Sequence, residues 1–532
     1  MVMRNNLLEA LSDNIVIDPD KCVFCNICVE TCILDNLRMK LAPCSRACPL
    51  GVNVQGYVQE VKRGNDDKAR AILRDKLIFP EILGRICPAP CESECHRGKV
   101  GDAAVAARAI KRYLTDGQGI EDRHVPEIAC VTGKRIAIVG SGPAGLQAAH
   151  DLRLAGHEVV VYECEKELGG MMRWGIPEFR LPGPVLDREL VLLEHIGVQF
   201  RCEVKVGADV TLDSLSRDYG AVIMAAGCSG AARLGIEGEN GDGVFYGLDV
   251  LKSARKLDGL SFTGSLVVIG GGNVAADAAQ VALRLGAAEV TVISLEGAGE
   301  LPAFPEELAN AGAAGIRFEH AWGPVRFITE SGKVSGVKLQ RCTAVFDVNG
   351  TFKPQFDSCT VKTIPADAVI VAIGQRREAD LFTEMGEVDP LTLQAGESNF
   401  FLAGDCHTGP GSVVKAMASG RRAAESAARF VAGEHLRYGR TYEGPFETEF
   451  DIDTSLGSDA PRVALTHKAF AGKGDFTELE GCLNEAAART EAGRCYSCGR
   501  PFGKFRTCWF CLPCEVECPE DALWVEVPYL QR

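Results

Sequence analysis

The sequence lacks the features that would place it in a membrane, in a secretory pathway or on nucleic acid. No apolar run approaches the roughly 20 residues that a membrane-spanning helix needs. The opening residues, MVMRNNLLEALSDN, have neither the basic start nor the apolar stretch of a signal peptide. The formal net charge is −15, which argues against binding to nucleic acid or to anionic membrane surfaces. We therefore expect a cytoplasmic protein with no membrane span and no nucleic-acid partner.

The cysteines lack the even spread of a disulfide framework. Of the 23 cysteines in this chain of 532 residues, 15 fall within residues 22–32, 44–95 and 495–518. Tight CxxC-type spacing in a large chain without a signal peptide indicates metal binding rather than disulfides. We expect the other eight cysteines to be small buried apolar residues. The length allows three or four domains.

The stretch Lys134–Glu163 has the pattern of a dinucleotide-binding unit: an apolar β-run, a glycine-rich turn, an amphipathic helix, a second β-run and a terminal acid. Gly140 permits the tight turn, Gly142 lets the backbone approach a pyrophosphate, and Gly145 lets the helix pack on the strand. The helix N-terminus offers N–H groups and positive dipole to the phosphates. Glu163, about 20 residues further on, can accept hydrogen bonds from ribose hydroxyls.

A second unit repeats this pattern in SLVVIGGGNVAADAAQVALRLGAAEVTVISLE, with Gly270, Gly272 and Asn273 in its turn. Two such units in one chain form an internal repeat of function. We expect one to bind FAD and the other a nicotinamide dinucleotide.

The residues after the last β-run of the second unit bear on which nicotinamide is used. Here the strand ends in Ser294, Leu295 and Glu296. A carboxylate repels a 2′-phosphate and accepts from a 2′-hydroxyl, so Glu296 predicts NADH over NADPH. The alternative is that Glu296 is a solvated loop acid and that another residue selects the cofactor.

Two cysteine runs have the spacing of bacterial ferredoxins, which hold [4Fe–4S] clusters. Zinc is the alternative, but tetrahedral zinc sites usually pair two CxxC elements a dozen or more residues apart. In two-cluster ferredoxins the fourth cysteine of each run binds the other cluster, so Cys32 and Cys518 would be exchanged if the two runs pack together. The runs are Cys22, Cys25, Cys28 and Cys32, and Cys508, Cys511, Cys514 and Cys518.

Between these runs, residues 41–125 are expected to be helical, with five further cysteines in loops between the helices. Three motifs in this segment specifically resemble the glutamate synthase small-subunit family, which includes the amino-terminal half of dihydropyrimidine dehydrogenase. They are CPLGVNVQGYV, GRICPAPCESEC and AIKRYLTD. The family usually has a further CxxC upstream of Cys44, where this chain reads LRMKLAP. It also often uses a non-cysteine ligand near Lys111. The five cysteines are Cys44, Cys48, Cys87, Cys91 and Cys95.

The resemblance also implies roles for several glycines. Gly170 is expected near the ribityl chain of FAD, and Gly227 where the chain crosses between the two dinucleotide domains. Gly374 is expected to end the second domain in the same way. Gly404 and Asp405 match the family's GD motif, in which the aspartate meets the ribityl–phosphate end of FAD. The neighbouring residues Cys406 and His407 are expected to pack rather than to react.

The number of clusters follows from the number of ligands. Four clusters need 16 ligands, and the three groups supply 15 cysteines. Three clusters are therefore expected, and a fourth would need one non-cysteine ligand. It would also need Cys495 and Cys498 to replace the missing CxxC.

The predicted fold is α/β, with two Rossmann-like domains for FAD and NAD, a helical iron–sulfur domain before them, and ferredoxin-like segments at both sides. The expected segments are 1–40 (ferredoxin type), 41–125 (helical iron–sulfur), 126–262 and 385–440 (FAD-binding), 263–384 (NAD-binding) and 441–532 (connector and ferredoxin type).

The sequence also lacks the dithiol of a flavin disulfide reductase. Residues 169–172 read GGMM where a CxxxxC would follow the first unit, and residues 260–384 contain no CxxC. Flavin normally converts between hydride and single electrons, which the clusters carry. We therefore expect a NADH-preferring electron relay in a hetero-oligomeric complex. By analogy its partner would be a catalytic subunit such as a 2-oxoacid:acceptor oxidoreductase that forms acyl-CoA.

Three other interpretations stay open. The chain resembles the small subunit of NAD(P)H-dependent glutamate synthase. It also fits a free-standing NADH:ferredoxin oxidoreductase. The last is a structural subunit whose second nucleotide site is degenerate.

Overall fold

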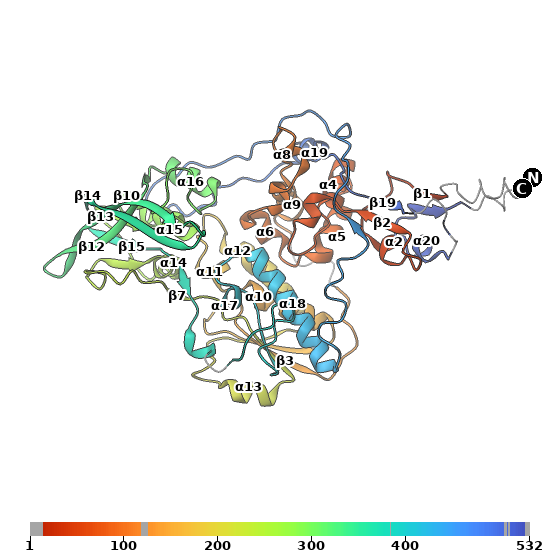
Figure 1. Cartoon of the computed structure of the whole chain (residues 1–532), viewed down its shortest axis with the longest axis horizontal. Coiled ribbons are helices and arrows are strands. Elements are labelled where there is room, and N and C mark those ends of the chain that lie inside the picture. The colour runs from red at the N-terminus through yellow and green to blue at the C-terminus, as the bar shows by residue number, and fades with distance from the viewer. Residues whose placement is uncertain (1–13, 119–125, 383–384, 505–507, 509–510, 527–532) are drawn as a thin grey trace, which may run out of the picture. The chain divides into compact units, whose positions relative to one another are not determined.

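A computed structural model describes residues 14–118, 126–382, 385–504, 508 and 511–526 (Figure 1). The chain forms two compact units. The cysteine unit comprises Met1–His124, Arg437–Thr466 and Cys482–Arg532, and it contains all 15 grouped cysteines. The dinucleotide unit comprises Val125–Leu436 and His467–Gly481, and it contains both glycine-rich turns. The predicted segment 441–532 is thus divided between the two units.

The first sheet of the dinucleotide unit is parallel and has the order β17-β6-β3-β4-β5. Its central strands are almost wholly buried, as expected for parallel strands covered on both faces. The strands are β3 (Arg135–Val139), β4 (Glu158–Tyr162), β5 (Gln199–Arg201), β6 (Ala221–Met224) and β17 (Phe400–Leu402). The helices are α10 (Pro143–Leu154), α11 (Met171–Trp174), α12 (Gly183–His195), α13 (Leu212–Asp218), α17 (Asp405–Thr408) and α18 (Val413–Ala432).

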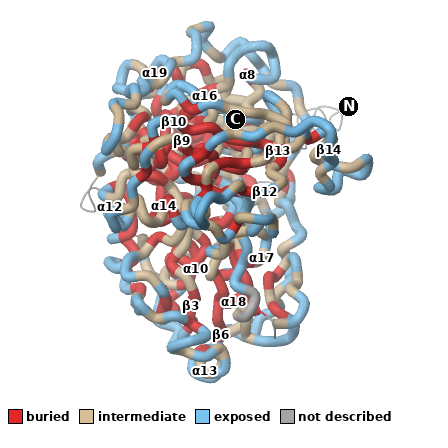
Figure 2. The backbone as a smooth tube through the Cα atoms, turned by 90° about the vertical axis from the view of Figure 1, so that its left-hand side faces the viewer, coloured by how far each residue is buried: buried red, intermediate tan, exposed pale blue. Residues whose placement is uncertain are grey.

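A second parallel sheet has the order β11-β10-β9-β15-β8. The buried positions in Figure 2 follow β9 and β10 here, as they follow β3 and β6 in the first sheet. The strands are β8 (Val244–Tyr246), β9 (Ser265–Ile269), β10 (Glu289–Ile293), β11 (Arg317–Glu319) and β15 (Ala368–Val371), with helices α14 (Gly247–Lys256), α15 (Asn273–Arg284) and α16 (Pro305–Ala313). Because β8 pairs with β15, the part of the chain that builds this sheet begins before residue 263, where the sequence placed the boundary.

Two smaller sheets complete the dinucleotide unit. An antiparallel sheet contains β12 (Trp322–Glu330), β13 (Lys333–Phe346) and β14 (Phe352–Pro365). The strands β7 (Gly230–Ala231) and β16 (Gln375–Arg376) pair antiparallel, and the 3₁₀ helix η2 (Ala379–Phe382) follows. The two segments that join the parallel sheets therefore run side by side just after Gly227 and Gly374.

Helices form the centre of the cysteine unit. The long helix α4 is amphipathic, and the Asn53 side chain caps it by accepting from Gly56 N. Helix α19 packs against α4 and α9. The helices are α3 (Pro43–Arg46), α4 (Val54–Arg63), α5 (Asp66–Lys76), α6 (Pro80–Ile86), α7 (Pro90–Ser93), α8 (His96–Lys99), α9 (Ala107–Thr115) and α19 (Glu485–Gly493).

The two ferredoxin-type runs form one module within the cysteine unit, which we call the terminal module (described residues of 14–40 and 500–526). Strand β1 (Ile15–Ile17) pairs antiparallel with β20 (Leu523–Val525). Strand β2 (Leu37–Lys40) lies between β18 (Phe446–Glu447) and β19 (Arg500–Gly503). Helix α2 (Ile27–Glu30) packs on α20 (Pro513–Val516), as Figure 1 shows.

None of the helices in the described part of the chain combines the length and the apolar character that a membrane span requires.

Candidate cofactor-binding sites

A large cavity in the dinucleotide unit lies at the carboxyl ends of the first sheet's strands. This is the edge at which open α/β sheets bind their ligands. Seven of the predicted FAD-binding residues line it: Gly140, Gly142, Glu163, Gly170, Gly227, Gly404 and Asp405.

The first turn requires glycine for steric reasons. Gly140 has a φ of +103°, and a Cβ there would lie 2.5 Å from Ala225 O. A Cβ on Gly145 would lie 2.0 Å from Gly140 O. Gly145 therefore packs under the turn and does not line the cavity, which matches the packing role expected from the sequence.

Glu163 is buried and directly follows β4. One carboxylate oxygen accepts from Ser141 N at 2.8 Å and from Ser141 Oγ at 2.5 Å, and the other accepts from Glu165 N at 2.8 Å. These bonds hold the carboxylate beside the turn, where an acid can accept from a ribose.

Two polar groups in the cavity wall are left unpaired by the described part of the chain. The buried Ser412 Oγ and Trp174 Nε1 lack hydrogen-bond partners among the described residues. Ser412 is also the N-cap of the 20-residue helix α18, and Gly142 is the N-cap of α10, so two helix N-termini meet the cavity. Burial raises the pKa of Asp405. Unpaired donors together with two positive helix ends fit a dinucleotide with its pyrophosphate.

Sequence reasoning missed residues that reach this cavity from elsewhere. Glu165 bonds Lys252 and, at 3.0 Å, Lys256, both on α14 of the second sheet. Glu165, Lys252 and Trp174 line the cavity. No motif marks them, because their placement depends on how the two sheets pack. Cys406 does not line the cavity, and its Sγ lies 3.3 Å from Met224 O.

The second turn repeats the geometry of the first. Gly270 has a φ of +142°, and a Cβ there would lie 2.3 Å from Ala372 O. Asn273 Oδ1 accepts from Phe304 N at 2.8 Å. Gly272 is the N-cap of α15, and Gly374, with a φ of +130°, follows β15. A Cβ on Gly272 would meet no atom within 4 Å, so the N-terminus of α15 has room for a phosphate.

The Glu296 carboxylate lies over this second turn. A Cβ on Gly271 would be 2.7 Å from Glu296 Oε2. Ser294 Oγ donates to Glu296 O at 3.1 Å and so steadies the loop. The carboxylate is therefore beside the turn rather than directed away into solvent.

The cysteines of the terminal module fall into two sets. Burial raises the pKa of Cys514 to about 11, and the thiols of Cys32, Cys508 and Cys511 add to this rise. Clustered thiols resist ionisation until a cation compensates their charge, which fits metal ligation. The first set, which lines one small cavity, is Cys22, Cys25, Cys28 and Cys518, and the second is Cys32, Cys508, Cys511 and Cys514. Cys518 thus lies with Cys22, Cys25 and Cys28 of the other run, as the expected exchange requires.

A third set joins residues about 400 positions apart in the chain. Burial raises the pKa of Cys498 to about 12, and the thiols of Cys495 and Cys95 add to this rise. Gln55 fixes the turn that carries the CxxC, because its amide pairs with Gly499 N at 2.7 Å and Gly499 O at 2.8 Å. The third set is Cys44, Cys95, Cys495 and Cys498, and these four line one small cavity together with Cys91.

Three grouped cysteines remain. Burial raises the pKa of Cys91, while Lys111 lowers it, and Cys87 and Cys48 are among the groups around it. We call Cys48, Cys87 and Cys91 the three-cysteine group. Lys111 is itself buried.

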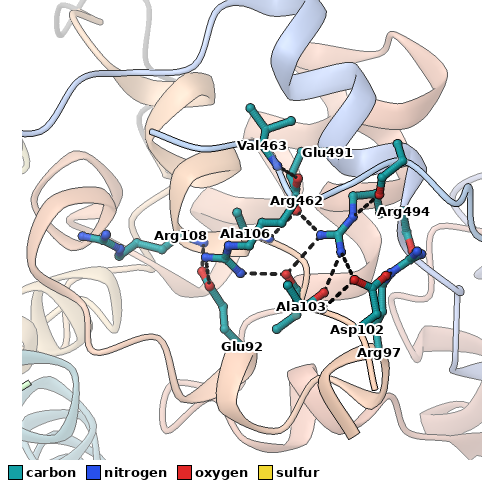
Figure 3. A network of polar contacts seen from close by, with 12 residues as sticks. Glu92, Arg97, Asp102, Ala103, Ala106, Arg108, Arg462, Val463, Glu491 and Arg494 are labelled. Carbon is teal, nitrogen blue, oxygen red and sulfur yellow. Dashed lines mark hydrogen bonds and ion pairs between the residues drawn. The ribbon is translucent and has the colours of Figure 1, made fainter. Parts of the chain in front are cut away.

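A buried ionic network holds the third set's surroundings (Figure 3). Glu491 accepts from Ala106 N at 2.8 Å and Val463 N at 2.7 Å, and it pairs with Arg494 at 2.7 Å. Neither Glu491 nor Arg494 is exposed. Arg97 donates to Arg494 O at 2.7 Å, immediately before Cys495. The network therefore joins the segments that carry Cys95 and Cys495.

Comparisons with known proteins agree with this arrangement. Residues 134–420 match the pyridine nucleotide-disulphide oxidoreductase family, and residues 6–122 match dihydropyrimidine dehydrogenase domain II, 4Fe-4S cluster. The chain is 34% identical to the NADP(+)-dependent formate dehydrogenase subunit beta of Moorella thermoacetica, over 86% of this chain and 71% of that protein.

Two further comparisons extend this picture. The chain is 33% identical to the NAD-dependent dihydropyrimidine dehydrogenase subunit PreT of Escherichia coli, over 74% of this chain and 92% of that one. The solved structure of FprA from Mycobacterium tuberculosis has a TM-score of 0.51 at 20% identity, over 56% of this chain and 85% of that chain, which supports the fold.

The expected family, fold class and cofactor types (FAD, NAD(P) and [4Fe–4S]) are confirmed. The chain belongs to the pyridine nucleotide-disulphide oxidoreductase family, and within it to the NAD(P)H-dependent FAD iron–sulfur electron-transfer subunits that resemble the glutamate synthase small subunit and dihydropyrimidine dehydrogenase.

Proposed function

We propose that this chain exchanges electrons between NADH and a separate protein partner, through FAD and four [4Fe–4S] clusters. The observation that supports this most is the grouping of 12 cysteines into three complete sets of four, in a chain that also has two dinucleotide turns. When bound, flavin supplies the change from two-electron to one-electron transfer, and clusters carry the single electrons.

The chain's own residues would bind and orient these groups. Glu163 would accept from the FAD ribose, and the N-termini of α10 and α18 would stabilise its pyrophosphate. Asp405 would meet the ribityl–phosphate end. Gly270, Gly272 and Asn273 would admit the nicotinamide dinucleotide at the N-terminus of α15. Glu165 and Lys252 pair in the wall of the cavity and would help to position the bound FAD.

We propose NADH as the preferred nicotinamide because the Glu296 carboxylate lies over the second turn. A 2′-phosphate placed there would meet a like charge, whereas a 2′-hydroxyl would meet an acceptor. The relatives' names do not decide the matter, since a formate dehydrogenase subunit and an Fe(3+) oxidoreductase subunit are named for NADP(+) or NADPH, whereas PreT is named for NAD.

The three-cysteine group is proposed as the fourth cluster site, completed by a ligand other than cysteine. Cys495 and Cys498 would take the place of the missing upstream CxxC in the third set. Iron analysis of anaerobically purified protein should then give about 16 iron atoms per chain rather than about 12. A count near 12 would limit the chain to its three complete sets.

We propose that the partner is a catalytic subunit formed by a separate polypeptide chain. The relatives are named as beta or PreT subunits of a formate dehydrogenase, an Fe(3+) oxidoreductase and a dihydropyrimidine dehydrogenase. Chains of this kind thus serve different catalytic chemistries. The 2-oxoacid oxidoreductase partner stays a prediction, as do the glutamate synthase and free-standing alternatives.

Anaerobic stopped-flow spectroscopy tests the proposal. NADH should bleach the flavin much faster than NADPH, and the broad cluster absorbance should then fall. The Glu296→Gln variant should narrow the gap between the two nicotinamides, while Glu300→Gln in the same loop should not. Preference for NADPH in the unaltered protein would overturn the cofactor assignment, and failure of both nicotinamides would favour a structural subunit.

A further inference from the structure

The outer surfaces of the first and second cysteine sets differ in polarity, although the two sets belong to matching runs. In the first run the turn residue between the second and third cysteines is Asn26, and the residue two places after the third cysteine is Glu30. The same positions of the second run hold Leu512 and Val516. The polar pair flanks the first set and the apolar pair the second.

The exchange of the fourth cysteines adds to this difference. Ile33 and Leu34 follow Cys32, which belongs to the second set, whereas Pro519 and Glu520 follow Cys518, which belongs to the first. At each of the four positions compared, the residue beside the second set is therefore apolar, and it is also exposed. We call them the apolar face: Ile33 (72% exposed), Leu34 (47%), Leu512 (40%) and Val516 (77%).

The residues of the apolar face come together through the packing of the terminal module. Helix α2 packs on α20, and Cys32 and Cys514 share one hydrophobic cluster with Val29 and Leu523. Each residue of the face lies within two positions of a cysteine of the second set. The chain therefore carries all four residues of the face next to cysteines of that set.

The backbone of Leu512 supports a role for its side chain outside the molecule. Asn26 and Leu512 both have left-handed backbones, with φ of +67° and +69°. Asparagine often adopts this conformation, whereas a bulky apolar residue rarely does. The second run therefore holds an exposed leucine where a polar residue would fit with less strain, and folding does not account for that choice.

The surface beside the first set, in contrast, contacts helices of the cysteine unit. Lys68 pairs with Glu520 at 2.6 Å, and Arg63 donates to Cys22 O at 3.4 Å. Helices α4 and α5 thus reach the first set.

We propose that the apolar face is the docking surface for the redox partner, and that this partner is a protein with an apolar centre surrounded by lysine and arginine. The charge next to the face is acidic: Asp35 and Glu517, both exposed, directly follow Leu34 and Val516. Arg38 pairs with Asp35, so Glu517 is the stronger attraction. Apolar contact would hold the partner, and the acidic rim would orient a basic one. This proposal rests on the proposed function.

Cytochrome c is a suitable probe, because it is a basic one-electron protein with an accessible apolar haem edge. Binding of ferricytochrome c to the full chain, measured by anaerobic calorimetry, should weaken by about tenfold in the Leu512→Asn/Val516→Ser double variant. The matched variant Glu30→Ser should change binding by less than about twofold. Leu512→Asn copies the residue of the first run, so it should not impair folding, and unchanged iron content verifies this.

Electron transfer gives a second readout. One NADH, releasing NAD⁺ and a proton, supplies two electrons that reduce two ferric haems to ferrous. The double variant should slow this reduction by about tenfold, while its reduction of ferricyanide, which needs no docking surface, should stay within about twofold of the unaltered chain.

Equal cytochrome c binding by the double variant and Glu30→Ser would overturn the docking proposal. So would self-association of the unaltered chain that the double variant abolishes, because the face would then bind a second copy. Failure of NADH to reduce ferricyanide in the unaltered chain would instead overturn the proposed function.

Discussion

The third cysteine set and the two sets of the terminal module are held by different interactions within the same unit. Buried charges surround the third set, where Glu491 and Arg494 are fully buried and bonded to backbone groups of distant segments. Apolar contacts and short strand pairs hold the terminal module, through Phe24, Val29 and Leu523 and the pairing of β1 with β20.

The comparison indicates different tasks for the two regions. A buried ionic network has a large penalty when any member is lost, so it fixes one geometry. A small apolar core with exposed edges tolerates more change and presents its surface to other molecules. We infer that the geometry of the third set is fixed, whereas the terminal module presents its surface to other molecules.

Loss of cysteine ligands should have the largest effect and tests the exchange directly. If Cys22 and Cys518 share a set, the double variant C22S/C518S should lose about four iron atoms per chain, because both changes affect one cluster. C508S/C518S should lose about eight, because two clusters are affected. Iron analysis with electron paramagnetic resonance measures both.

The expectation that the ungrouped cysteines are buried is wrong for Cys130, Cys164, Cys359 and Cys482, which are exposed. Because Cys130 belongs to no cysteine set, C130S is the control and should lose no iron. The opposite result, with about eight lost in C22S/C518S and about four in C508S/C518S, would show that each run keeps its own fourth cysteine.

Removing a charge from the buried network should have the next largest effect. Arg494→Met leaves Glu491 buried without its ion-pair partner, so the free energy of unfolding of the cysteine unit should fall by about 3–5 kcal/mol. Denaturant titration, followed by cluster absorbance, measures this.

Arg462→Met is the matched change at the exposed edge of the network, where Arg462 pairs with Glu92 at 2.7 Å. It should cost less than about 1 kcal/mol. Equal losses of unfolding free energy in the two variants would contradict the view that the buried centre of this network, rather than its exposed edge, holds the third set.

The amide clamp on the third set should have an intermediate effect. Gln55→Ala would leave Gly499 N and O without their buried partners and should lower the free energy of unfolding by about 1–3 kcal/mol. The signal of the third set's cluster should also broaden, because the turn with Cys495 and Cys498 would be less fixed.

Lys62→Ala on the same helix removes an exposed contact to Leu456 O at 3.3 Å and a charge that acts on Cys495, but no buried hydrogen bond, so its effect on the free energy of unfolding should be within about 0.5 kcal/mol. An undisturbed resonance signal in Gln55→Ala would show that the clamp does not set the geometry of the CxxC turn.

The smallest expected effect concerns pH. Burial raises the pKa of Asp66, but hydrogen bonds from Arg489 and Tyr113 outweigh it, so the pKa lies below its ordinary 3.8. A depressed pKa contributes stability above the unfolded value, and this is lost as the pH falls through the folded value. Apoprotein unfolding below about pH 4 should therefore be less acid-sensitive in Asp66→Asn. Asp213→Asn, in the dinucleotide unit, should leave the acid slope of the cysteine unit unchanged.

The sequence predicted those parts of the sites that depend on local spacing. The turns around Gly140 and Gly270 are local, because the glycines, the helix start and the strand end lie within a few residues. The fold class and the cofactor types were predicted for this reason, and the family was predicted from motifs such as GRICPAPCESEC that resemble it; all three predictions are confirmed. Cofactor preference, cluster number and partner stay predictions.

What the sequence could not supply is contact between distant segments. Spacing alone does not show that Cys95 joins Cys495, or that Lys252 of α14 reaches Glu165 beside the FAD cavity. These contacts are set by the packing of whole helices, for which neither residue carries a local signal. Only the missing CxxC upstream of Cys44 indicated that a distant pair was needed.

The pairing of distant cysteines also has a consequence for biosynthesis. The first set spans residues 22 to 518, and the third spans 44 to 498. A ribosome has therefore made nearly the whole described chain before the scaffold machinery can load either set with iron. Incomplete chains would hold unloaded thiols, which makes them easy for quality-control proteases to distinguish from finished protein. Loading would also close loops of several hundred residues, so each inserted cluster would cross-link a polypeptide that is already translated.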